Sequence, residues 1–266
     1  MIRDITLGQY YPGDSVIHRL DPRTKLFGTI VYIVSLFLCN NWTGYAFACI
    51  CLALFIILSK VPLGFIFKGL RSIAVLLLIS VSFNLFLTQG EIVWQLGPVH
   101  ITKEGIQIAC QMAVRLTCLV IGTSLMTLTT TPNMLTDGME KGLGFLKVIK
   151  VPVHEIAMMM SIALRFIPIL IEETDKIMKA QMARGADFET GGIIKKAKAL
   201  IPLLVPLFIS AFRRATDLAT AMEARCYHGG EGRTKMKPLK YATRDYIAYI
   251  IIFLMLAAFI ATRKFG

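Results

Sequence analysis

The sequence predicts an all-α, polytopic membrane protein with about five transmembrane helices and a cytoplasmic domain of long helices. Of its 266 residues, 55% are hydrophobic, and the mean hydropathy is +0.63. The apolar residues gather into long runs, as a bilayer requires, because one helical span needs roughly 20 mostly apolar residues. The 29 Lys and Arg residues exceed the 17 Asp and Glu residues, and such an excess is typical of the cytoplasmic side of membrane proteins.

The first half of the chain consists of a polar segment, residues 1–25, and a region of four apolar runs, residues 26–130. The predicted spans cover residues 26–40, 44–59, 72–88 and about 106–128. The first two are short for a span and require tilt or a thinned bilayer, and one re-entrant hairpin is an alternative for this pair. Arg115 lies within the fourth span, where a charge is costly, so we expect it to face protein or water.

Residues 131–244 differ from the spans because charges interrupt their apolar runs. Proline also occurs within these runs, at Pro168, Pro202 and Pro206, and a proline bends or breaks a helix. We therefore predict a cytoplasmic domain of helices that lie in the cytoplasm or at the membrane surface. The three expected helices cover about 133–146, 152–184 and 192–227. A last span and the C-terminus follow in residues 245–266.

The distribution of charge predicts the topology. With residues 131–244 inside and five spans, the N-terminus is cytoplasmic, and all but four of the 29 basic residues lie on the cytoplasmic side or its flanks. The opposite orientation would reverse the positive-inside bias. The net charge of +12 is thereby explained without a nucleic-acid partner, for which no basic and aromatic motif is present.

The sequence predicts no catalytic residue, no metal site and no cofactor bound by this chain. It lacks the G-x-x-x-x-G-K-[ST] loop that cradles nucleotide phosphates. Its four histidines are scattered, and the apolar spans hold almost no ionisable side chains, which argues against a proton or ion pathway.

A short pattern repeats at the ends of the two long helices expected in residues 131–244. Ala180 and Ala183 precede Arg184 and Gly185, and the second copy is Ala221, Ala224, Arg225 and Cys226. Alanines three residues apart share a helix face and allow a partner to approach closely. Arginine is favoured at a helix C-terminus by the helix dipole, and its planar fork of donors suits carboxylates or carbonyl groups on a partner.

With these motifs, the chain resembles the transmembrane (T) component of energy-coupling factor transporters over nearly its whole length. The resemblance rests on the segment from His18 to Lys25, on Thr130-Thr131-Pro132, on the segment from Ala163 to Pro168, and on the two repeated motifs. It implies a coupling subunit in the prokaryotic plasma membrane that transmits conformational change during uptake of a vitamin or metal ion. The implied partners are two cytoplasmic ABC ATPases, which use ATP and Mg, and a membrane S component that binds the substrate.

The resemblance also implies roles for particular residues. The two helix ends dock one ATPase each, with Arg184 and Arg225 as the anchors. Cys226 departs from the glycine of the family pattern and adopts the left-handed cap conformation less easily, so we expect the second helix to continue to Gly229-Gly230.

The upper faces of the long helices are implied to contact the S component. The candidate residues are Met158, Met159, Ile162, Ala163, Phe166 and Ile167. Methionine suits an adaptable surface that accepts more than one partner, although the same methionines could instead fill a helix–helix core.

Two other functions remain open from the sequence. An ABC permease with its own substrate path would need polar groups converging from several spans, and the spans supply only Arg115 with a few Asn, Ser and Thr. An intramembrane enzyme would need His, Asp or Glu clustered at one membrane depth, and no such cluster is evident.

Overall fold

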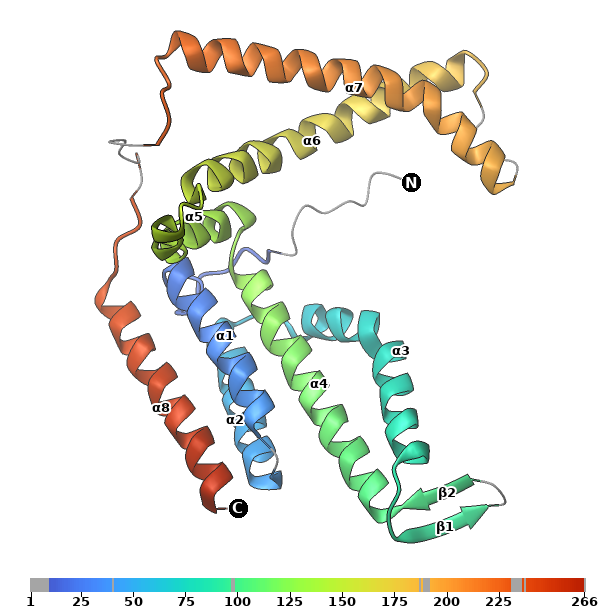
Figure 1. The fold of residues 1–266 in the computed structure, drawn as a ribbon, viewed down its shortest axis with the longest axis vertical. Coiled ribbons are helices and arrows are strands. Elements are labelled where there is room, and N and C mark those ends of the chain that lie inside the picture. The colour runs from blue at the N-terminus through green and yellow to red at the C-terminus, as the bar shows by residue number, and fades with distance from the viewer. Residues whose placement is uncertain are drawn as a thin grey trace. The chain divides into compact units, whose positions relative to one another are not determined.

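The structure is almost entirely helical. The computed structural model describes residues 10–39, 41–96, 99–186, 188, 192–230, 236 and 238–265. In chain order the elements (Figure 1) are α1 Pro22–Leu38, α2 Trp42–Ser59, α3 Leu63–Leu87, β1 Ile92–Leu96, β2 Val99–Thr102, α4 Lys103–Thr129, α5 Pro132–Gly142, the 3₁₀ helix η1 Gly144–Ile149, α6 Val153–Ala183, α7 Ile193–Ala224 and α8 Thr243–Phe265. The prediction of an all-α polytopic protein is confirmed, with one antiparallel hairpin, β1–β2, between α3 and α4.

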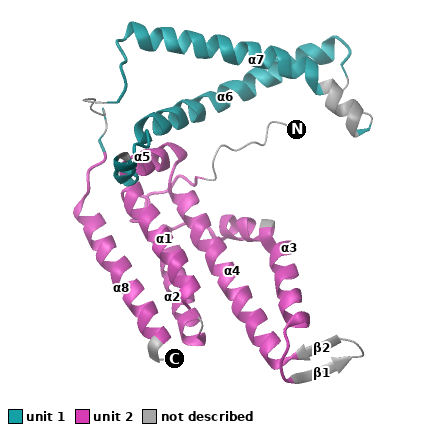
Figure 2. Ribbon diagram, viewed as in Figure 1, with its two compact units in different colours: residues 1–7, 142–238 teal, residues 8–141, 239–266 magenta. Residues whose placement is uncertain are grey.

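The chain folds as two compact units (Figure 2). Unit 1 comprises residues 1–7 and 142–238, and unit 2 comprises residues 8–141 and 239–266. The predicted cytoplasmic domain starts earlier than unit 1, at residue 131, because α5 belongs to unit 2. There α5 packs closely on the start of α1: a Cβ atom added at Gly138 would lie 3.0 Å from Cβ of Pro22.

Four helices in the described part of the chain are long and apolar enough to cross a membrane. They are α2, α4, α6 and residues Thr243–Arg263 of α8. A fifth span results if the two segments of α3, Leu63–Arg71 and Ile73–Leu87, which meet at an angle of 58°, form one broken span. The number agrees with the prediction, but α6 is among these helices and α1 is not. Length and composition do not separate a spanning helix from an apolar surface helix, so the cytoplasmic location of α6 stays a prediction.

Helix α1 lies among the spans although it is short. Its 17 residues extend about 25 Å at roughly 1.5 Å per residue, which is less than the ~30 Å thickness of the hydrocarbon core. It packs against α8 and α4, both of which are long enough to span. We therefore retain α1 as a transmembrane segment that requires a locally thin bilayer.

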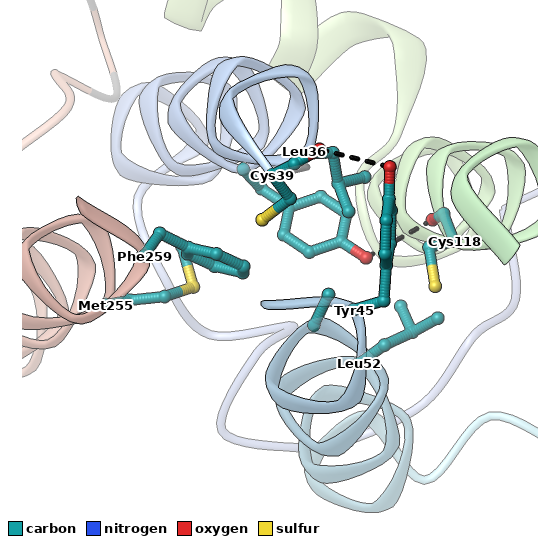
Figure 3. Close-up of a cluster of buried hydrophobic side chains, with 9 residues drawn as sticks. Leu36, Cys39, Tyr45, Leu52, Cys118, Met255 and Phe259 are labelled. Carbon is teal, nitrogen blue, oxygen red and sulfur yellow. Dashed lines mark hydrogen bonds between the residues drawn. The ribbon is translucent and has the colours of Figure 1, made fainter. Parts of the chain in front are cut away.

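The core of unit 2 forms where α1, α2, α4 and α8 meet (Figure 3). It contains the buried side chains of Tyr32, Leu36, Cys39, Tyr45, Ala48, Leu52, Cys118, Met255 and Phe259. Its polar atoms are paired, since the Tyr32 hydroxyl donates to the carbonyl oxygen of Cys118 at 3.3 Å. The four helices are thus held by apolar burial with internal hydrogen bonds, as a bilayer environment demands.

A lysine joins the start of α1 to the end of α4. The Lys25 ammonium donates to the carbonyl oxygens of Thr129, at 2.8 Å, and His18, at 3.1 Å, and the lysine is only 8% exposed. The amide of Tyr11 donates to the carbonyl of Leu128 at 2.9 Å. The last carbonyl groups of α4, which have no partner within the helix, are therefore paired by the N-terminal segment.

Two buried aspartates join the start of α1 to the start of α8. Asp245 accepts hydrogen bonds from the backbone amides of Asp21 and Ala242, both at 2.8 Å. Asp21 accepts from the amide of Arg23 at 2.9 Å and pairs with its guanidinium at 3.0 Å. Each carboxylate thus lies at a helix N-terminus, where negative charge is stabilised. The segment from His18 to Lys25, on which the family resemblance partly rests, performs this structural role.

Arg115 faces protein, as expected. Its guanidinium donates to the carbonyl oxygen of Cys39 at 2.9 Å and to the Tyr45 hydroxyl at 2.6 Å. Because Cys39 is the C-cap residue of α1, the cation lies at the negative end of that helix dipole. Arg115 therefore fixes the turn between α1 and α2 from the side of α4.

We expect Arg115→Leu to destabilise unit 2 by about 1.5–3 kcal/mol, the usual contribution of hydrogen bonds to a charged group. Thermal unfolding in detergent measures this loss, and Arg263→Leu, at an exposed position of α8, is the matched control. Equal melting temperatures for both variants and the parent would show that Arg115 does not support the turn.

Candidate functional site

The first repeated motif forms the C-terminal cap of α6. Arg184 is the C-cap residue, and Gly185 follows with a φ of +87°. The amide of Gly185 donates to the carbonyl of Met182 at 3.0 Å, and the amide of Ala186 donates to that of Gln181 at 2.9 Å. These two bonds around a left-handed residue define a Schellman motif, so backbone groups alone close this helix.

The second motif closes α7 with the same geometry. Arg225 is the C-cap residue and Cys226 takes the left-handed position with a φ of +53°. The amide of Cys226 donates to the carbonyl of Glu223 at 2.9 Å, and that of Tyr227 donates to Met222 at 3.0 Å. The expectation that α7 continues to Gly229-Gly230 is therefore wrong. The reason is that the hydrogen bonds from backbone amides to the last carbonyl groups of α7 stabilise the cap by more than the cost of about 1–2 kcal/mol for a left-handed L-residue.

All residues of the two motifs are exposed on the chain. This holds for Ala180, Ala183, Arg184, Gly185, Ala221, Ala224, Arg225 and Cys226. Among the described residues, neither arginine takes part in an ion pair. Each helix end thus presents small side chains and a guanidinium that forms no ion pair with the described residues. This arrangement suits the docking of a partner.

The helices α6 and α7 cross and run in opposing directions (Figure 1), so their C-terminal ends, which carry Arg184 and Arg225, lie at opposite ends of the crossed pair. Arg214 of α7 pairs with Glu173 of α6 at 3.1 Å. Nearer the end of α6, Nε2 of Gln181 donates to the carbonyl oxygen of Pro202 at 3.3 Å. That carbonyl is free because its helical partner would be the amide of Pro206, which proline lacks. The prolines of α7 therefore create a contact that holds the crossing.

The predicted S-component residues lie on the first half of α6 and differ in exposure. Met159 and Ala163 are exposed, and Met159 is 57% exposed, whereas Met158, Ile162, Phe166 and Ile167 are half-buried. They thus form a continuous, partly accessible apolar stretch. Their exposure argues against a role for Met159 in filling a helix–helix core.

The prediction omitted a larger apolar stripe on α7. Its members are Leu200, Ile201, Leu204, Val205, Phe208, Ile209 and Phe212, all between 44% and 70% exposed. The spacing of three and four residues places them on one face of a helix. This spacing is visible in the sequence. There, however, the prolines and the flanking charges indicate an interrupted transmembrane span, which does not predict an exposed stripe.

Within the described residues, no three His, Cys, Asp or Glu side chains lie close enough together to hold a metal ion. Glu172 and Glu173 are adjacent carboxylates on α6, and that of Glu173 is engaged by Arg214. The distinctive features of the chain are therefore its capped helix ends and its apolar faces.

Comparison with known proteins agrees with the resemblance. Residues 13–236 match the family described as cobalt transport protein, CbiQ. Three relatives are each described as an energy-coupling factor transporter transmembrane protein, EcfT. The relative from Thermosediminibacter oceani is 52% identical over 98% of this chain and 99% of its own. The relative from Clostridium kluyveri is 54% identical over 99% of this chain and 98% of its own. The relative from Bacillus subtilis is 48% identical over 97% of this chain and 97% of its own. The chain therefore belongs to the CbiQ family, as a transmembrane component of energy-coupling factor transporters.

Proposed function

We propose that this chain couples two cytoplasmic ABC ATPases to a membrane S component that binds a vitamin or metal ion. The observation that carries the proposal is the pair of matching caps, in which Arg184 and Arg225 project from opposite ends of one unit. In this proposal each end docks one ATPase. ATP and Mg act in those partners, because this chain contains no phosphate-binding loop.

The cap geometry supports the role of the arginines as anchors. A Schellman motif satisfies the last carbonyl groups of the helix with backbone amides. The guanidinium is then free to bind a partner, and its backbone position is fixed before binding, which reduces the entropic cost of association. Alanine at the preceding positions leaves room for the partner surface. In this proposal a movement of either ATPase is transmitted along α6 or α7 to the rest of the chain.

The apolar faces of α6 and α7 are the proposed contact for the S component. On α6 this surface contains Met159, Ala163 and Phe166, and on α7 it contains the stripe that runs from Leu200 to Phe212. On helices that lie outside the bilayer core, as we propose for α6 and α7, contiguous exposed apolar surface marks an interaction site. Methionine on α6 allows the surface to adapt to different partners.

We further propose the prokaryotic plasma membrane as the location, with the N-terminus in the cytoplasm. The positive-inside bias of the charged residues supports this orientation. It also places α6 and α7 on the side where ATP is available.

An ABC permease with its own substrate path is the weaker alternative. Such a path would use charged or polar groups inside the bundle, and Arg115 is the ionisable residue that the sequence offers there. Its guanidinium is engaged by the Cys39 carbonyl and the Tyr45 hydroxyl. An intramembrane enzyme has less support still, since the two buried aspartates of the described residues are already engaged, Asp21 by Arg23 and Asp245 by backbone amides.

We expect Arg184→Ala combined with Arg225→Ala to release both ATPases and to abolish uptake. Loss of one buried, paired arginine in an interface typically costs roughly 2–4 kcal/mol, which weakens the contact by about 30- to 700-fold. Each single variant retains partial assembly because the second site still tethers the partners. The ATPase content of the purified complex and uptake into vesicles measure these effects.

The control for this pair is Arg213→Ala, which removes another exposed arginine of α7 outside the motif. Lysine at 184 and 225 should restore little binding, because an ammonium lacks the planar fork. Normal uptake and full ATPase content in the double alanine variant would exclude the anchoring role.

We expect Cys226→Gly to strengthen the cap of α7. Glycine adopts the left-handed conformation without the free-energy penalty of about 1 kcal/mol that a side chain brings. This difference should slow amide hydrogen exchange at the end of α7 by about fivefold. Hydrogen exchange of the peptide covering residues 220–228 measures it. Gly185→Ala should accelerate exchange at the end of α6 by a similar factor, since no atom within 4 Å would obstruct the new Cβ and the cost is conformational alone. Unchanged exchange in both variants would contradict the cap assignment.

A further inference from the structure

Unit 2 contains a partly open cavity of about 300 Å³ among α1, α2, α4, α8 and the N-terminal segment. Its wall is almost wholly apolar and includes Phe55, Leu125, Ile251 and Met255. This volume lies at the lower end of the range for ligand sites in proteins, roughly 300–1,000 Å³. An apolar cavity of this size is poorly hydrated by water, so an apolar occupant is expected.

Polar groups line one end of the same cavity. Thr24 and Lys25 belong to the first turn of α1, and Arg244 belongs to the first turn of α8. These helix starts are adjacent, because the amide of Asp21 donates to Asp245 at 2.8 Å. The cavity is therefore amphipathic, with its polar residues gathered where α1 and α8 begin.

One of these polar residues has an unpaired hydroxyl group. The hydroxyl of Thr24 makes no hydrogen bond to any of the described residues, although the residue is only 1% exposed. Buried hydroxyl groups are rarely left in this state. Because Thr24 lines the cavity, a ligand there would lie beside this residue.

The charges at this end favour an anion. Among the described residues, no carboxylate lies within 4.0 Å of Lys25 or Arg244, and the hydrogen bonds of the Lys25 ammonium go to neutral carbonyl oxygens. The two nearby carboxylates are already engaged, Asp21 by Arg23 and Asp245 by backbone amides. Exposed Arg244 therefore remains available for a negatively charged group.

We infer that this cavity binds an anionic membrane phospholipid. One acyl chain fills the apolar part, and the phosphate lies at the end lined by Thr24 and Arg244. The bilayer supplies this occupant directly, because the helices that line the cavity include α2, α4 and α8, which are long and apolar enough to span. Basic residues at the cytoplasmic membrane surface attract anionic lipids in the same manner. The bound lipid would brace α8 against α1 and α4, and its binding requires neither ATPase.

The test uses the purified full chain in detergent, stripped of lipid. Dioleoyl phosphatidylglycerol and dioleoyl phosphatidylcholine are added in mixed micelles, and bound lipid is counted by native mass spectrometry together with the melting temperature. We expect the anionic lipid to bind and to raise the melting temperature, and the zwitterionic lipid to do so at least tenfold less well. Arg244→Gln should remove this preference, whereas Arg263→Gln, at the other end of α8, should retain it.

A second pair of variants tests the acyl-chain site. Ala248 lines the cavity, and Ala257 is an exposed residue of the same helix outside it. Ala248→Phe should reduce bound phosphatidylglycerol at least tenfold, and Ala257→Phe, with the same added volume, should not. The inference is overturned if neither lipid stabilises the parent chain, if both lipids do so equally, or if a folded Ala248→Phe variant binds as much lipid as the parent. Failure of the parent chain to bind any ATPase, with lipid binding intact, would count against the proposed function alone.

Discussion

The carbonyl groups at the C-terminal ends of the helices impose the constraint on which this structure depends. They have no partner within their own helix, and in a membrane water does not replace one. For α1 and α4 of unit 2 the partners come from elsewhere in the chain, whereas α2 is closed locally by the amide of Lys60. Arg115 and Tyr45 pair with Cys39 at the end of α1, and Lys25 pairs with Thr129 at the end of α4. The bundle is therefore closed by a few polar side chains whose loss would leave buried groups unpaired.

Unit 1 meets the same constraint differently. Backbone amides close α6 and α7 through left-handed residues, Gly185 and Cys226. Arg184 and Arg225 therefore take no part in pairing the last carbonyl groups through their side chains, in contrast to Arg115, and they stay exposed. The carbonyl that Pro206 leaves free is paired by Gln181, which ties the crossing of the two long helices. Arg115 and the two proposed docking arginines thus differ in what closes the helix beside them.

The sequence was sufficient to predict most of the helices, because long apolar runs, charge breaks and cap residues are local signals. It did not predict the start of α3 at Leu63, nine residues before the expected span, or the β1–β2 hairpin. It also identified both repeated motifs, and it predicted that Arg115 faces protein or water. The prediction that α7 continues past Cys226 was wrong. It relied on the intrinsic preference of cysteine against the left-handed conformation, whereas two cap hydrogen bonds hold Cys226 in that conformation. The sequence could not predict the contacts of Lys25 and Asp245, which join segments far apart in the chain. The spacing of the apolar stripe on α7 can be seen in the sequence. Its exposure cannot be predicted from that spacing, because exposure depends on which helices pack against α7.

We propose that each cap arginine lies against a separate ATPase, and site-specific photo-crosslinking from a neighbouring residue tests this placement while both arginines are kept. A photoreactive phenylalanine analogue would replace exposed Met182, close to Arg184, or exposed Glu223, close to Arg225, with exposed position 213 of α7 as the control. We expect one adduct of this chain with one ATPase subunit from position 182 and another from position 223. A complex labelled at both positions should carry two ATPases, and position 213 should give neither adduct. Crosslinks from 182 and 223 that reach only lipid, or the same yield from 213, would contradict the placement.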